Sequence, residues 1–222
     1  MAVIIEGNKI AQDIREQIRV ETAALKKNKG IIPGLAVVLL GNDPASEIYV
    51  GRKIKSCSEI GFLSRECRLP GNTSESELVK LIDNLNADDS IHGILVQLPL
   101  PKHISADKII TTIDPRKDVD GFHPYNSGAL LSGSPLFVPC TPRGIMELIF
   151  RTGIKLSGKE AVVVGRSNIV GKPVALLLLA QHATVTICHS RTNNLADVTK
   201  RADVLIAAVG KPHMITAEMV KK

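Results

Sequence analysis

Short apolar runs that alternate with amphipathic segments are the feature that most constrains how this 222-residue chain can fold. The run Leu35–Leu40 is wholly apolar and stops at Gly41, which is typical of a buried parallel strand. The next segment, Ser46–Ile60, predicts a helix that ends at Gly61. Repeated strand–helix alternation implies right-handed crossovers and a mostly parallel sheet. The sequence therefore predicts an α/β fold.

The alternation continues along the chain and restarts after a polar, turn-rich interval from Asp114 to about Ser134. We expect further strands at Phe62–Arg68, Ile91–Gln97, Ala161–Val164, Thr184–Cys188 and Val204–Val209. We expect further helices at Lys9–Thr22, Ser74–Asn86, Arg143–Arg151, Val170–Gln181 and Asn194–Lys200. The restart predicts two α/β domains, residues 1–139 and residues 140–222.

Composition narrows the class of partner. The net charge of +6 and the pI near 9.2 favour anionic partners. The 28 Lys and Arg are spread along the chain and only 3% of residues are aromatic, so we expect no nucleic-acid partner. A dinucleotide or a polycarboxylate fits the charge equally well.

Cysteine, histidine and apolar patterns indicate the compartment. The four cysteines are widely separated without C-x-x-C, and the six histidines lack metal-ligand spacing, so we expect a reducing compartment and no metal. The N-terminus does not resemble a signal peptide, and no apolar stretch is long enough to cross a membrane. These patterns predict a soluble, cytoplasmic protein without a membrane partner.

A glycine-bounded turn follows the apolar strand Ala161–Val164. The glycines Gly165 and Gly171 bracket it, and Pro173 fits the first turn of the following helix. The free N–H groups and the dipole of a helix N-terminus favour anions, so we expect a phosphate site here. The spacing matches neither G-x-G-x-x-G nor a magnesium-binding P-loop.

The segment after the next strand indicates which dinucleotide would bind. NAD-preferring sites commonly place a carboxylate there for the ribose hydroxyls. This chain instead reads Cys188-His189-Ser190-Arg191-Thr192, without a carboxylate, and its Arg, Ser and Thr donors would suit a 2′-phosphate and therefore NADP. The alternative is a surface turn that is basic by chance.

Candidate catalytic side chains follow the strands of the first half. Tyr49 and Lys53 are four residues apart on one face of the predicted helix, and Gln97 ends a predicted strand. Ligands bind beyond the carboxyl ends of strands in open α/β sheets, so these side chains could converge with Asp118 and Asp120. A partly desolvated lysine suits proton transfer near neutral pH. Taken singly, however, a helical lysine is usually solvated and a nearby tyrosine usually packs.

Five ordered motifs carry a resemblance that covers most of the chain. They are Ser46-x-x-Tyr49-Val50-x-x-Lys53-x-Lys55, Gly93-Ile94-Leu95-Val96-Gln97-Leu98-Pro99-Leu100-Pro101, Lys117-Asp118-Val119-Asp120-Gly121-Phe122, Pro139-Cys140-Thr141-Pro142 and Gly165-Arg166-Ser167-x-Ile169-Val170-Gly171-x-Pro173. Together they resemble the bifunctional methylenetetrahydrofolate dehydrogenase / methenyltetrahydrofolate cyclohydrolase family.

The resemblance implies two steps in one cleft between the two domains, and a homodimer. A hydride passes from 5,10-methylenetetrahydrofolate to NADP⁺, and water opens the methenyl product to 10-formyltetrahydrofolate. It implies that Lys53 is the general acid/base, that Gln97 hydrogen-bonds Lys53, that Tyr49 stacks on the aminobenzoate ring and that Asp120 binds the pterin. The implied substrate contacts also include Val96, Leu98 and Pro99. The implied cofactor contacts are Gly165, Arg166, Ser167, Ile169, Val170, Gly171, His189, Ser190 and Arg191.

The resemblance also implies that family members continue beyond Lys222, so we expect an incomplete Rossmann-like second domain. Two other interpretations stay open. One is a fragment that binds folate or a dinucleotide with impaired dehydrogenase activity. The other is an NADP oxidoreductase like shikimate dehydrogenase, against which Tyr49, Lys53 and Gln97 argue.

Overall fold

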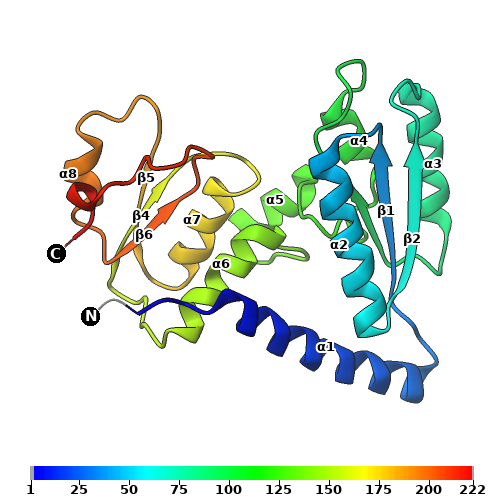
Figure 1. Ribbon diagram of the computed structural model, residues 1–222, viewed down its shortest axis with the longest axis horizontal. Coiled ribbons are helices and arrows are strands. Elements are labelled where there is room, and N and C mark those ends of the chain that lie inside the picture. The colour runs from blue at the N-terminus through cyan, green and yellow to red at the C-terminus, as the bar shows by residue number, and fades with distance from the viewer. Residues whose placement is uncertain (1–2, 222) are drawn as a thin grey trace. The chain divides into compact units, whose positions relative to one another are not determined.

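The computed structural model describes residues 3–221 and has the predicted mixed α/β architecture with parallel sheets (Figure 1). The chain divides into two compact units, one ending at Pro124 and the next beginning at Tyr125. We call them unit 1 and unit 2 and describe each by itself. The expected boundary at residues 139/140 stays a prediction.

Unit 1 is built around a three-stranded parallel sheet of order β2-β1-β3. Its strands are β1 (Gly34–Leu40), β2 (Leu63–Leu69) and β3 (Gly93–Val96). Its helices are α1 (Gly7–Lys29), α2 (Pro44–Ile60), α3 (Glu75–Ala87) and α4 (Ala106–Thr112). The central strand β1 is almost entirely buried, which explains why its sequence is continuously apolar.

Alternate residues of β1 supply two cores, because successive side chains point to opposite faces of the sheet. Ala36, Val38 and Leu40 pack with residues of α3 and α4, and Val37 and Leu39 pack with residues of α2 and β3. The helix α2 therefore covers one face of the sheet while α3 and α4 cover the other (Figure 1).

The N-terminus of α2 is fixed by a sequence signal. The Asp43 carboxylate accepts a hydrogen bond from the Ser46 backbone N–H at 2.8 Å, and Pro44 occupies the first turn. At the other end, Gly61 takes a left-handed conformation with φ 83° that closes the helix. These two ends place α2 directly after the carboxyl end of β1.

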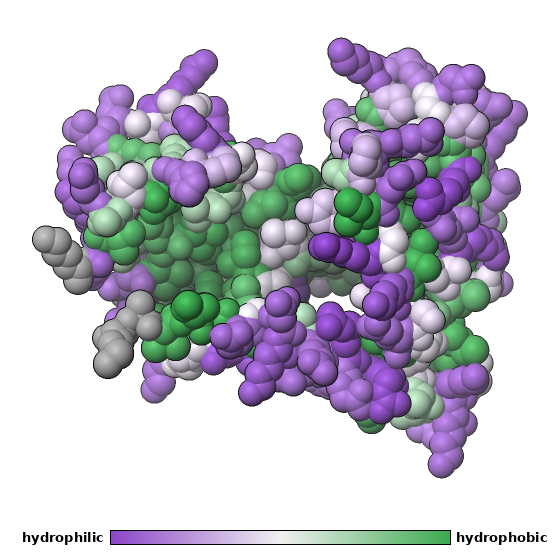
Figure 2. Space-filling view, viewed as in Figure 1, coloured by the Kyte–Doolittle hydropathy of each residue, from purple (hydrophilic) through white to green (hydrophobic). Residues whose placement is uncertain are grey.

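Unit 2 repeats this plan with a parallel sheet of order β5-β4-β6. Its strands are β4 (Glu160–Val164), β5 (Thr184–Cys188) and β6 (Val204–Ala207). Its helical elements are α5, which begins at the unit boundary (Pro124–Leu131), α6 (Cys140–Arg151), α7 (Gly171–Ala180), α8 (Leu195–Thr199) and the 3₁₀ turn η1 (Ala217–Met219). The helices α6 and α7 pack on one face of the sheet and α8 on the other. Figure 2 shows an apolar surface over α7 and β6.

The predicted strands and helices are confirmed, with ends that differ by a few residues except for α1, which extends to Lys29. The prediction that residues Asp114 to about Ser134 form only turns was wrong in part, because this interval contains α5. This helix has only two buried residues, Asn126 and Leu130, so its apolar stripe is too short to recognise. No helix was predicted at α4 either. Across residues 3–221, no helix has both the length and the apolarity that a membrane span requires.

Candidate functional site

The carboxyl ends of β1 and β3 define the first candidate site. The chain leaves β1 toward β2 on one side, whereas β3 lies on the other side, so this is the topological switch point of the sheet. The helix α2 begins beyond β1, and Gln97 follows β3. The Gln97 backbone N–H donates to the Val38 carbonyl at 2.9 Å, which continues the strand pairing to the edge of the site.

Lys53 and Gln97 meet at this switch point. The Lys53 Nζ donates to the Gln97 Oε1 at 3.0 Å, although the residues are 44 positions apart. The Gln97 Nε2 donates to the Leu98 carbonyl at 2.8 Å, so the amide oxygen is turned toward the lysine. Lys53 is partly buried, and its amine therefore lies in a fixed, partly desolvated position.

Tyr49 lies one turn before Lys53 on α2, and Tyr49 is 57% exposed. The ring is therefore not a core residue and its surface is open to a planar ligand. Val96 differs, because its side chain is buried in the core with β1 and α3, so only its backbone can contact a ligand. Leu98 and Pro99 follow Gln97, joined by a cis peptide bond.

Two carboxylates reach the site in the loop that follows α4. Asp118 is 2% exposed, and its Oδ2 accepts from the His123 backbone N–H at 2.9 Å. Burial raises the pKa of Asp120 to about 6; the nearby Lys53 charge lowers that pKa, and the Asp118 charge raises it. The structure thus links Lys53 to Gln97 by a hydrogen bond and to Asp120 by the interaction of their charges.

The second candidate site is the turn from β4 into α7. Gly165 has φ 129°, and a Cβ there would lie 2.3 Å from the Ala208 carbonyl oxygen. A Cβ on Gly171 would lie 2.3 Å from the Gly165 carbonyl oxygen. Both glycines are therefore required by close backbone approach at the ends of β4, β6 and α7.

The prediction that the N–H groups at the start of α7 are free was wrong, because Ser167 accepts hydrogen bonds from them. Its Oγ accepts from the backbone N–H groups of Val170 at 3.1 Å and Gly171 at 3.2 Å, and its carbonyl accepts from the Lys172 N–H at 3.0 Å. Since Pro173 has no N–H, the donors of the first turn are already engaged within the loop. An anion at this turn would depend on the helix dipole and on side-chain donors.

Those side-chain donors lie after β4 and β5. Arg166, Ser190 and Arg191 are all exposed. His189 shapes the turn that carries two of them: its backbone N–H donates to the Thr192 Oγ1 at 2.8 Å, and its Nδ1 accepts from the Arg191 N–H at 3.2 Å. Ile169 is exposed and Val170 half-buried at the mouth of the same turn.

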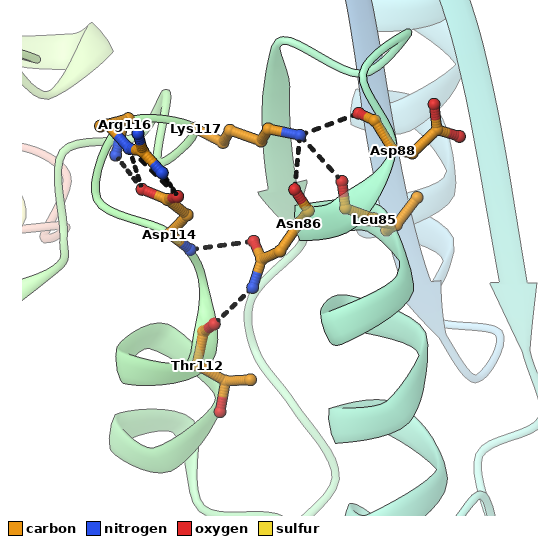
Figure 3. Close-up of polar contacts among 7 residues, drawn as sticks. All are labelled: Leu85, Asn86, Asp88, Thr112, Asp114, Arg116 and Lys117. Carbon is orange, nitrogen blue, oxygen red and sulfur yellow. Dashed lines mark hydrogen bonds and ion pairs between the residues drawn. The ribbon is translucent and has the colours of Figure 1, made fainter.

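Sequence reasoning missed a network at the end of α3, shown in Figure 3. The Lys117 Nζ donates to the carbonyls of Leu85, Asn86 and Asp88 at 3.2, 2.7 and 2.8 Å. The side chain of Asn86 links the same helix end to the chain after α4. The only signal in the sequence was the position of Lys117 directly before Asp118. No cluster of three or more His, Cys, Asp or Glu suited to a metal occurs within residues 3–221.

Comparison with protein families gives two matches. Residues 5–120 match the family described as tetrahydrofolate dehydrogenase/cyclohydrolase, catalytic domain. Residues 139–222 match the tetrahydrofolate dehydrogenase/cyclohydrolase, NAD(P)-binding domain.

Individual relatives agree with the family matches. The bifunctional protein FolD of Magnetococcus marinus is 56% identical over 222 residues, covering 100% of this chain and 78% of the relative. The crystal structure of the FolD methylenetetrahydrofolate dehydrogenase/cyclohydrolase from Campylobacter jejuni has a TM-score of 0.96 at 46% identity, covering 99% of this chain and 78% of that one. The Trypanosoma brucei enzyme, solved with NADP and an inhibitor, has a TM-score of 0.94 at 37% identity, with 99% and 76% covered.

Proposed function

The chain belongs to the tetrahydrofolate dehydrogenase/cyclohydrolase family, and we propose that it oxidises 5,10-methylenetetrahydrofolate with NADP⁺ and hydrolyses the methenyl product to 10-formyltetrahydrofolate. Family membership replaces the interpretation as a shikimate dehydrogenase-like enzyme. Nothing in the comparisons favours a fragment that binds without turnover. The assignment of individual residues and the choice of NADP over NAD are the further parts of the proposal.

The Lys53–Gln97 hydrogen bond is the observation that carries the hydrolytic step. The Lys53 amine accepts a proton from the water that attacks the methenyl carbon, and then returns a proton to N5 as the carbon–N5 bond breaks. The hydroxyl proton of the intermediate goes to solvent, so the step releases one proton overall. Gln97 keeps Nζ at a fixed position through both transfers.

The remaining groups of unit 1 would bind and orient the folate. The exposed ring of Tyr49 stacks on the aminobenzoate ring. The ionised carboxylate of Asp120 accepts two parallel donors from the amino-pyrimidine edge of the pterin. Contacts from Val96, Leu98 and Pro99 complete the binding surface, those of Val96 through its backbone.

The side chains of unit 2 fit NADP. Arg166, Ser190 and Arg191 are exposed donors at the carboxyl ends of β4 and β5, and no carboxylate follows β5 up to Asn194. Such a donor set favours a 2′-phosphate, which the ribose of NAD lacks. Gly165, Ser167, Ile169, Val170, Gly171 and His189 shape the turn that presents these donors. When bound, NADP⁺ supplies the hydride acceptor.

The proposal also covers the cellular compartment and the oligomeric state of the protein. The four cysteines are free thiols in the structure, which supports a reducing compartment such as the cytoplasm. The homodimer is proposed from the family resemblance alone.

Separate assays of the two steps test the proposal. One supplies 5,10-methylenetetrahydrofolate with NADP⁺ or NAD⁺ and follows the absorbance of the reduced cofactor. The other supplies 5,10-methenyltetrahydrofolate and follows the loss of its absorbance. We expect both activities, with NADP⁺ preferred. No hydrolysis would refute the role of Lys53, and equal use of the two cofactors would refute the 2′-phosphate site.

A further inference from the structure

Lys117 is a charged side chain whose partners are backbone carbonyls. An ammonium group has three N–H donors, and the three carbonyls of Leu85, Asn86 and Asp88 provide one acceptor for each. These carbonyls lie at the carboxyl end of α3, where the helix dipole favours a positive charge. Figure 3 shows the lysine reaching from its loop to this helix end.

Asn86 holds the other end of the same loop. Its Nδ2 donates to the Thr112 carbonyl at 2.8 Å, and its Oδ1 accepts from the Asp114 backbone N–H at 2.9 Å. The stretch from residue 112 to residue 117 is therefore fixed to α3 at both of its ends. The attachment of this loop to α3 is thus made by the side chains of Asn86 and Lys117.

The loop passes directly from Lys117 into the site. The Lys117 carbonyl accepts from the Ile94 backbone N–H at 2.7 Å, and Asp118 forms a parallel bridge with Ile94. Asp120 follows two residues after Asp118, and the charge of Lys53 lowers the pKa of its carboxyl. A change in the position of Lys117 would therefore be transmitted through three residues to the Asp120 carboxyl.

We propose that Lys117 is a positioning residue for the folate reaction, holding the loop so that the Asp120 carboxyl stays partly buried and within electrostatic reach of Lys53. The inference rests on the proposed function, in which Asp120 binds the pterin and Lys53 transfers protons. Lys117 itself touches neither the substrate nor the reacting atoms. Its effect is on where Asp120 lies and on how strongly water is excluded from that carboxyl.

The decisive variant is Lys117→Met, which keeps the apolar stem and removes the three donors. One carboxylate and one cation act on the titration of Asp120: Asp118 on its own loop and Lys53 on α2. Because burial is the largest cause of the raised pKa, a loosened loop should return the pKa of Asp120 from about 6 toward 4. The measurement is a carboxyl carbon-13 NMR titration of the whole protein with labelled aspartate.

Kinetics give the second readout. In Lys117→Met we expect the KM for methenyltetrahydrofolate to rise about tenfold, with a smaller change in kcat, because ground-state binding is what Asp120 provides. The acid limb of the pH profile of kcat/KM should move to lower pH along with the NMR titration. If Lys117 only capped α3, Lys117→Met would lower the melting temperature but leave two midpoints unchanged: that of the Asp120 NMR titration and that of the acid limb of kcat/KM.

The chain offers a matched control and a second variant. Arg116 is next to Lys117 in the same loop and pairs with Asp114 at the surface, so Arg116→Met should leave KM and both midpoints unchanged. Asn86→Ala removes the other attachment of the loop and should shift the Asp120 titration in the same direction by a smaller amount.

The outcomes separate the inference from the function on which it rests. If the parent protein does not hydrolyse methenyltetrahydrofolate, the proposed function fails, while the NMR titration still tests the hold of Lys117 on Asp120. If the parent is active and Lys117→Met keeps its KM and its Asp120 midpoint, the inference is wrong. Should Lys117→Met fail to fold, an unchanged Asp120 midpoint in Asn86→Ala would overturn the inference equally.

Discussion

The two units use the same strand order in different ways. In unit 1 the functional side chains contact and tune one another: Lys53 bonds Gln97, and both Lys53 and Asp118 act on the pKa of Asp120. In unit 2 the basic side chains Arg166 and Arg191 are exposed, and the backbone turn is what is held tightly. Proton transfer requires a fixed amine and a controlled pKa, whereas recognition of a phosphate requires accessible positive charge on a rigid turn.

The largest effect is expected from Lys53→Met, which removes the amine that is hydrogen-bonded to Gln97 in unit 1. Methenyl hydrolysis should fall about 1,000-fold, since general acid–base catalysis supplies rate factors of this order. NADP binding, measured by fluorescence titration, should be unchanged. Lys55→Met is the control, because Lys55 lies on the same helix with a 79% exposed side chain. Comparable losses in the two variants would show that the helix, and not the amine at position 53, was damaged.

The rigid turn of unit 2 is tested by Gly171→Ala. The new methyl group would lie 2.3 Å from the Gly165 carbonyl oxygen, so the turn must shift. We expect the free energy of unfolding to fall by about 3 kcal/mol, with weaker NADP binding. Denaturant unfolding followed by circular dichroism measures the change. Gly144→Ala in α6 meets no atom within 4 Å and should cost nothing; a similar loss there would contradict the packing argument.

The accessible charge of unit 2 is tested by Arg191→Ala. Removing a charge-assisted hydrogen bond to the 2′-phosphate should weaken NADP binding about 30-fold and leave NAD binding nearly unchanged. Isothermal titration with each dinucleotide gives both constants. Arg201→Ala removes an exposed arginine that pairs with Glu160 in the same unit and serves as the comparison. Equal weakening of NADP and NAD would remove the case for a phosphate contact.

The dependence of KM on pH tests whether the raised pKa of Asp120 affects substrate binding in unit 1. With the pKa of Asp120 raised to about 6, the carboxylate that we propose binds the pterin is protonated as pH falls through that value. The KM for methenyltetrahydrofolate should therefore rise about fivefold between pH 6 and pH 5, following the ionised fraction of one carboxyl. Steady-state kinetics across this range measure it. In Asp120→Asn the KM should be high and flat with pH; a persisting inflection would assign the titration to another group.

Much of the fold was predictable because strand and helix signals were local. The strand Thr184–Cys188 was predicted to the residue, and the helix predicted over Ser74–Asn86 differs from α3 by one residue at each end. The short helices α4 and α5 were missed because they have few buried residues and are held by packing with the rest of the chain. Their positions are set by tertiary contacts that no local window contains.

The candidate site shows the same division. Lys53, Gln97 and Asp120 could be proposed from strand ends and motifs, because parallel topology brings strand ends together. The bonds of Lys117 could not, since a lysine is ordinarily solvated and its reach to α3 depends on the folded path of two distant segments. The engaged N–H groups at the start of α7 were missed because one serine, Ser167, bonds back onto its own loop.

The burial of the Asp120 carboxyl makes the folded state less stable at neutral pH than at mildly acidic pH. An acid whose pKa is raised from 3.8 to about 6 on folding binds more protons in the folded state between those values, so unfolding becomes easier as pH rises through this window. The Asp120 carboxyl therefore lowers the free energy of unfolding at neutral pH, where the carboxylate is the form proposed to bind the pterin. Selection for thermal stability alone would remove Asp120, whereas the proposed role in pterin binding would retain it.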